Sequence, residues 1–105
     1  MTKINVKGAV VSNDDADIYD WLGYDCVSPN MVEDVLNNSD GDVEVDIASG
    51  GGSVFAASEI YTMLKAYSGK VVVNSQGLAA SAASVIAMAG DEMNMTPTSQ
   101  MMIHK

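Results

Sequence analysis

Cysteine and histidine are nearly missing from this sequence, which contains one of each, Cys26 and His104. A single thiol cannot form an intramolecular disulfide, and one thiol with one imidazole cannot make a structural zinc site. Basic residues are also scarce, with five Lys and Arg against fourteen Asp and Glu and a net charge of -9. No basic cluster is present to neutralise phosphates. We therefore expect no metal or other cofactor, no nucleic-acid partner, and a reducing, cytoplasmic setting.

Long apolar runs are missing as well. The least polar stretch, residues 77–90, consists mainly of Ala and Ser and is shorter than the roughly 20 residues that a membrane-spanning helix needs. The first residues alternate between polar and apolar, which differs from the continuous apolar region of a signal peptide. Apolar residues still make up 48% of the 105 residues, enough for the core of one small domain. We expect one domain spanning residues 1–105 and no membrane span.

The apolar pattern predicts strands that alternate with helices. We expect a turn-forming loop after the first strand, a helix capped by Ser28 with Pro29 at its first position, and a turn at Gln76-Gly77. The predicted strands cover residues 4–11, 43–47, 71–73, 93–95 and 101–103, and the predicted helices cover residues 29–36, 54–67 and 79–89. This order is typical of an α/β fold with a parallel sheet.

Three segments whose residues could take part in catalysis or binding fall at the carboxyl ends of predicted strands, where α/β sheets bind ligands. They are the glycine loop Gly50 to Gly52, Ser81 at the start of a helix, and His104. Read singly, each has a plainer structural explanation: a turn, a helix cap and a structural histidine. The sequence has no G-x-S-x-G, dinucleotide-binding or P-loop motif. The carboxylates Asp40 to Asp46 are interpreted as solvated surface.

Taken in order, five short motifs resemble the proteolytic subunit of the Clp protease family. They are Ser49-Gly50-Gly51-Gly52, Ile60-Tyr61, Gly77-Leu78-Ala79-Ala80-Ser81, Ala89-Gly90 and Met102-Ile103-His104. The resemblance implies a serine endopeptidase with the spiral of ββα units that Clp peptidases share with crotonases. It also implies a protein or peptide substrate and, at full length, a homo-oligomeric ring.

The resemblance assigns roles to seven residues. It implies Ser81 as nucleophile, His104 as general base, the N–H groups of Gly52 and Ala82 as oxyanion donors, and Gly51, Ser53 and Val54 as lining of the substrate groove. Two positions depart from the family pattern: Gly50 replaces its proline and Ala48 its asparagine.

Within the family, the opening segment and the run from Gly77 to Ser84 look most like the head maturation proteases of phages and prophages, which process capsid or scaffold proteins. The early start of the first strand argues against docking to an unfolding ATPase. The family places its triad Asp and its handle region after the histidine. We therefore expect these 105 residues to be truncated, with little or no activity of their own and some uncovered apolar surface.

The sequence is also compatible with two other functions. A non-catalytic oligomerisation or capsid-associated module would keep the fold without the chemistry. A crotonase-type acyl-CoA enzyme would share the ββα architecture, but it would give no reason for Ser81 and His104 to occur together.

Overall fold

A computed structural model of the chain describes residues 2–79, 81–95 and 100–101. The strands are β1 (Thr2–Val10), β2 (Cys26–Val27), β3 (Val43–Gly52), β4 (Val71–Ala79), β5 (Glu92–Met95) and β6 (Gln100–Met101). The helices are α1 (Asn13–Leu22), α2 (Pro29–Asn37), α3 (Val54–Ala66) and α4 (Ser81–Ala87). None of the helices in these ranges has the length and apolar character that a bilayer crossing requires.

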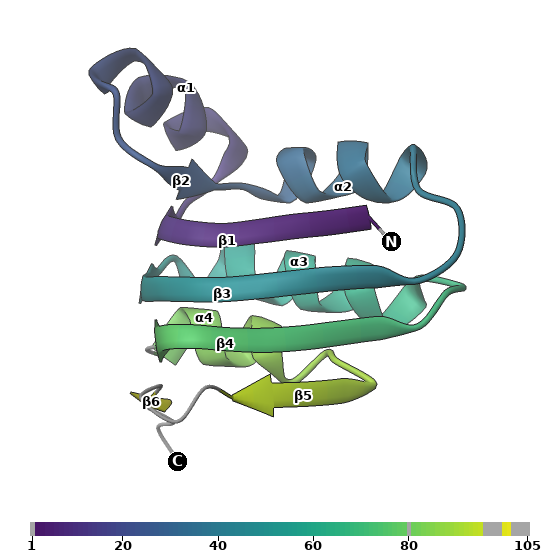
Figure 1. Cartoon of the computed structure of the whole chain (residues 1–105). Coiled ribbons are helices and arrows are strands. Elements are labelled where there is room, and N and C mark those ends of the chain that lie inside the picture. Colours follow the sequence, from purple (N-terminus) through teal and green to yellow (C-terminus); the bar gives the residue numbers. More distant parts are fainter. Residues whose placement is uncertain (1, 80, 96–99, 102–105) are drawn as a thin grey trace.

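The strands form one sheet in the order β2-β1-β3-β4-β5, with β6 paired to β4, and every pairing is parallel. Figure 1 shows α3 and α4 packed behind this sheet, while α1 projects from the end where the strands finish. The predicted α/β fold with a parallel sheet is therefore confirmed. Because the strands run in the same direction, the segments that follow them all begin at one edge.

The core lies between the sheet and the helices. Val43, Val45 and Ile47 alternate along β3 and are fully buried, as the period of a strand requires. Ile60 and Leu64 of α3 lie four residues apart on one helix face and are buried with them. At roughly 25 cal/mol per Å² of apolar surface removed from water, this layer is the main source of stability.

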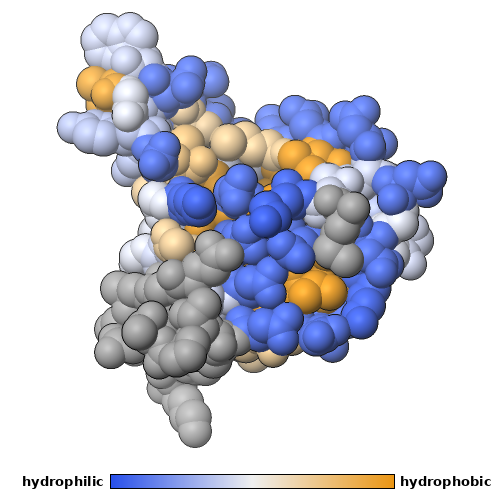
Figure 2. Space-filling view, viewed as in Figure 1, coloured by the Kyte–Doolittle hydropathy of each residue, from blue (hydrophilic) through white to orange (hydrophobic). Residues whose placement is uncertain are grey.

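The opposite face of the sheet carries a row of polar side chains that crosses four strands. Lys3 Nζ lies 3.3 Å from Asp46 Oδ2. Asn74 donates to Asp46 Oδ1 at 3.1 Å, and Asn94 donates to Asn74 Oδ1 at 3.1 Å. Hydrogen bonds with Glu44 and Asp46 raise the pKa of Lys3 above 10.5. Figure 2 shows that this face is largely hydrophilic.

Asp46 corrects the interpretation of these carboxylates as solvated surface, because only 4% of this residue is exposed. Its neighbours in the polar row cover it, and each of its two carboxylate oxygens has a partner. A buried charge is tolerated when it is paired and hydrogen-bonded in this way. The alternation of β3 identified the strand but could not show which of its polar residues was covered.

Helix α1 occupies a segment that the turn-forming residues after the first strand predicted to be a loop. Ser12 caps this helix by accepting a hydrogen bond from the Asp15 N–H at 3.2 Å, and Gly23 ends it with a φ of 79°. The cluster of Asn and Asp residues favoured a turn, but the same residue types are also preferred at helix starts. Ile18, Trp21 and Leu22 follow the spacing of three and four residues that is typical of a helix, and this spacing favours a helix over a turn.

Ser28 stands at the N-cap position of α2 as predicted, but its side chain makes no capping hydrogen bond. The cap comes from another helix, since Asn13 Oδ1 accepts from the Asn30 N–H at 2.8 Å. Strands β3 and β4 also continue further than predicted, through the glycines to Gly52 and through Gln76-Gly77 to Ala79. Neighbouring strands on both sides supply hydrogen-bond partners that offset the weak strand propensity of glycine.

Two buried serines on neighbouring strands differ in their hydrogen bonds. Ser49 Oγ donates to the Gly8 carbonyl and accepts from the Gly51 N–H at 3.1 Å. These bonds tie an irregular point of β1, where Gly8 has a φ of 74°, to the glycines of β3. Ser75 Oγ on β4 is buried and has no hydrogen-bond partner among the residues that the structure describes.

These serines form a matched pair for measurement. Ser49→Ala should lower the free energy of unfolding by about 1–3 kcal/mol, because the Gly8 carbonyl and the Gly51 N–H lose a partner. Ser75→Ala should leave stability unchanged or raise it, because an unsatisfied hydroxyl is removed. Urea unfolding of both variants compares the two values. A larger loss of unfolding free energy for Ser75→Ala than for Ser49→Ala would contradict the hydrogen bonds described for the two serines.

Candidate active site

The glycines at the end of β3 form the first part of the site. Gly52 has a φ of 148°, and a Cβ at this position would overlap the Val10 carbonyl oxygen of β1. That oxygen also accepts a hydrogen bond from the Ser53 N–H at 2.8 Å. Gly50, in contrast, has open space where a side chain would lie. The close approach to β1 therefore makes glycine necessary at Gly52.

Helix α3 begins directly after these glycines. Ser53 is its N-cap, and Ser53 Oγ accepts from the Ala56 N–H at 3.2 Å. Val54 and Phe55 follow in the first turn and are both exposed, Phe55 to 87%. The predicted groove residues Gly51, Ser53 and Val54 thus lie together at the carboxyl end of β3, with Gly51 buried and Val54 open to solvent.

Ser81 is the first residue of α4 and follows β4 closely. In the sheet register Ala79 of β4 lies opposite Ser49 of β3, so the chain before Ser81 runs beside the chain before Gly52. Ala82 is fully buried. The structure therefore brings the glycine segment and the start of α4 to one edge of the sheet, as the strand order predicted.

Strand β6, which comes before His104 in the sequence, reaches the same edge. Met101 of β6 pairs with Ala79 of β4, and Gln100 pairs with Leu78. His104 itself lies outside the described residues. Its role as a base therefore stays a prediction.

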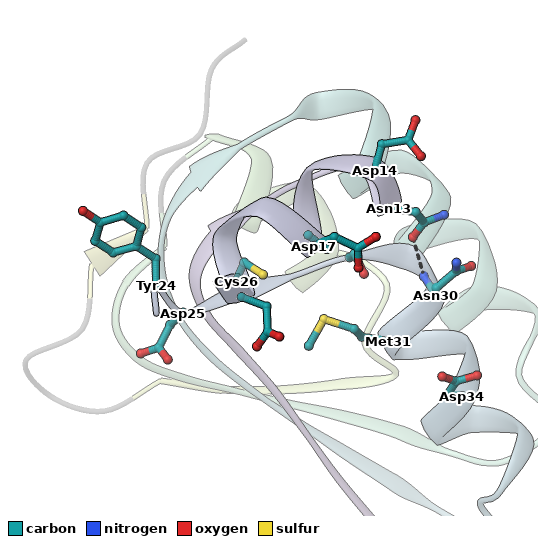
Figure 3. A pocket seen from close by; sticks show the side chains of 12 residues that line it. Asn13, Asp14, Asp17, Tyr24, Asp25, Cys26, Asn30, Met31 and Asp34 are labelled. Atoms are coloured by element: carbon teal, nitrogen blue, oxygen red, sulfur yellow. Dashed lines mark hydrogen bonds between the residues drawn. The ribbon is translucent and has the colours of Figure 1, made fainter. Parts of the chain in front are cut away.

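A wide hollow lies elsewhere, between α1 and α2. Its volume is about 610 Å³, and Figure 3 shows Cys26 among the lining residues, with Asp17 and Met31 to one side of it and Asp25 to the other. Burial, and then the nearby carboxylates of Asp20 and Asp25, raise the pKa of Cys26 above 9.0. A thiol in this state stays protonated at neutral pH and is a poor nucleophile. Within the described ranges no group of His, Cys, Asp or Glu residues could hold a metal ion.

Sequence reasoning missed the residues that hold the glycine segment in place. Ser49 belongs to the glycine motif, but the motif does not show its hydrogen bonds. One of them reaches Gly8, 41 residues earlier, and the other comes from Gly51, two residues later. Val10 contributes its carbonyl oxygen, which no side-chain pattern reports. The strand alternation of residues 4–11 was the only signal that could have led to Val10.

Solved structures resemble this fold closely. A ClpP1 mutant from Listeria monocytogenes matches 97% of this chain with a TM-score of 0.74 and 23% sequence identity. The ClpP protease catalytic domain from Plasmodium falciparum matches 98% of it with a TM-score of 0.74 and 24% identity. The chain spans about half of each, 55% and 53%. At this identity the likeness establishes the fold.

No curated protein matches the chain. The family model described as Clp protease matches residues 27–105, which include the glycine segment, Ser81 and His104. Because this match covers well over half of the sequence, the chain belongs to the Clp protease family.

Proposed function

We propose that this chain carries the nucleophile, base and oxyanion donors of a Clp-type serine endopeptidase. Ser81 attacks the scissile carbonyl and His104 accepts its proton. The backbone N–H groups of Gly52 and Ala82 stabilise the oxyanion that forms.

The strand register is the observation that carries the proposal. Ser49, Ala79 and Met101 lie side by side on β3, β4 and β6. Gly52 follows the first by three residues, Ser81 follows the second by two, and His104 follows the third by three. Such short lengths, at no more than about 3.6 Å per residue, support the proposal that the three groups act together.

The substrate of this peptidase is a protein segment that binds as an added strand along the groove of Gly51, Ser53 and Val54. The exposed start of α3 supports this placement, because it leaves Val54 open to an incoming chain. The motifs around Gly77 to Ser84 support an assignment to the head maturation proteases of phages and prophages. The substrates would then be phage capsid or scaffold proteins, and the enzyme would act in the cytoplasm.

Oligomerisation is part of the proposal, and α1 supports it. No residue of this helix is buried, and Ile18, Trp21 and Leu22 are all more than half exposed. Short helices gain most of their stability from packing an apolar face. A neighbouring subunit of the homo-oligomeric ring would supply that packing.

A fluorophosphonate probe tests the nucleophile in the full-length protein. Labelling should map to Ser81 and should vanish in Ser81→Ala, while Ser84→Ala, one helical turn further along α4, keeps it. His104→Ala should slow labelling by about a hundredfold or more, because the base is lost. Equal labelling of the wild type and Ser81→Ala would refute the assignment.

Two glycine variants test the oxyanion donor. Gly52→Ala should slow labelling at Ser81 by roughly a hundredfold, because the added Cβ displaces the loop from Val10 and misplaces its N–H. Gly50→Ala is the control, since its Cβ enters open space. Circular dichroism checks that both variants fold. Similar labelling rates for the two variants would remove Gly52 from the oxyanion hole.

Substitutions at one position test the role of α1. Trp21→Glu should lower the assembled mass measured by sedimentation, because a charge replaces an aromatic side chain that is 84% exposed in the single chain. Trp21→Phe should preserve the assembly. If the mass is the same for both variants, α1 does not form the ring contact.

A further inference from the structure

A second, smaller hollow lies beside the glycine segment. Its volume is about 240 Å³, and the first turns of α1, α2 and α3 form its walls. At roughly 30 Å³ per water molecule it could hold several waters or part of one long side chain. Ser53, the residue after Gly52, lines it, so the hollow adjoins the proposed oxyanion donor.

Three helix starts would ordinarily favour an anion, because their free N–H groups point outward. Here a side chain of the protein already caps each start, which reduces the number of free donors. The capping bonds run from Asp15 N–H to Ser12 Oγ (3.2 Å), from Asn30 N–H to Asn13 Oδ1 (2.8 Å) and from Ala56 N–H to Ser53 Oγ (3.2 Å). Figure 3 shows the second of these bonds.

The charged side chains that line the hollow are both carboxylates. Asp14 of α1 and Glu59 of α3 both line it and both are exposed. Neither has an ion pair or a hydrogen bond through its side chain within the described part of the chain. They are therefore free to accept hydrogen bonds from a cationic ligand.

Phe55 adds an aromatic wall. It lies four residues before Glu59 on α3, which places the two side chains on one face of the helix. The phenylalanine is 87% exposed, and a ring in this position can pack against an alkyl stem or attract a cation to its face. An aromatic ring beside two free carboxylates matches a lysine or arginine side chain.

We propose that this hollow is a specificity subsite that binds a lysine or arginine side chain of the protein substrate. The inference rests on the proposed peptidase function and extends it, because it names a residue type that the substrate carries close to the scissile bond. Glu59 and Asp14 bind the cationic group, and Phe55 packs against its stem. The net charge of -9 favours the approach of such a basic segment.

Binding is measured on the full-length protein with Ser81→Ala, so that cleavage plays no part. The probes are three acetylated tetrapeptide amides, Ala-Ala-X-Ala, in which X is arginine, its neutral isostere citrulline, or glutamate. Backbone amide shifts in NMR titrations report affinity and location. We expect the arginine peptide to shift the amides of Ser53, Phe55 and Glu59, and to bind about fivefold more tightly than the citrulline peptide.

Variants separate the subsite from general charge. Glu59→Gln and Phe55→Ala should each weaken binding of the arginine peptide about threefold to fivefold, and both residues are exposed enough for the fold to tolerate the change. Glu33→Gln is the matched control, because it removes the same charge from α2 outside the hollow. Its affinity for the arginine peptide should equal that of the parent.

Several results would overturn the subsite. They are equal affinity for the arginine and citrulline peptides, equal losses for Glu59→Gln and Glu33→Gln, no binding of any peptide, and binding of inorganic phosphate at the same amides. Failure of the fluorophosphonate to label Ser81 would instead overturn the peptidase and leave the measured binding as it stands. The two proposals can thus fail separately.

Discussion

The parallel pairing of β1, β3 and β4 is the constraint on which the rest of the molecule depends. Because the three strands run in the same direction, each delivers the following segment to the same edge of the sheet. The glycine segment, Ser81 and β6 reach that edge from different parts of the sequence. Helix α1 starts there too, which creates the hollow beside Ser53.

Close contact between backbones refines this arrangement. Gly52 lies against the Val10 carbonyl, and Ser49 joins the irregular point at Gly8 to Gly51. The Ser49 contacts occur where the register between the strands shifts, and Val10 and Gly52 pair just beyond that shift. An irregular strand end that is held by hydrogen bonds can direct N–H groups away from the sheet.

Much of this architecture could be predicted from the sequence. The alternation of Val43, Val45 and Ile47 and the spacing of Ile60 and Leu64 identified elements whose burial the structure confirms. Predictions were wrong where local preference and tertiary context differ. Asn and Asp residues after Ser12 favoured a turn and form a helix start, and the glycines continue β3 because strands flank it on both sides. The cap of α2 comes from Asn13, seventeen residues before Asn30, at a separation that no local rule covers.

The polar row on the open face has a consequence for how the strands find their alignment. Asp46 can only accept hydrogen bonds, so Lys3 and Asn74 must donate to it, and Asn94 then donates to Asn74. The row thus has a fixed direction across the sheet. A slip of one residue in any strand would turn its member toward the apolar core and break the sequence of donors. These side chains therefore specify the register of the strands. A purely apolar packing layer would not do so, because many similar arrangements satisfy it.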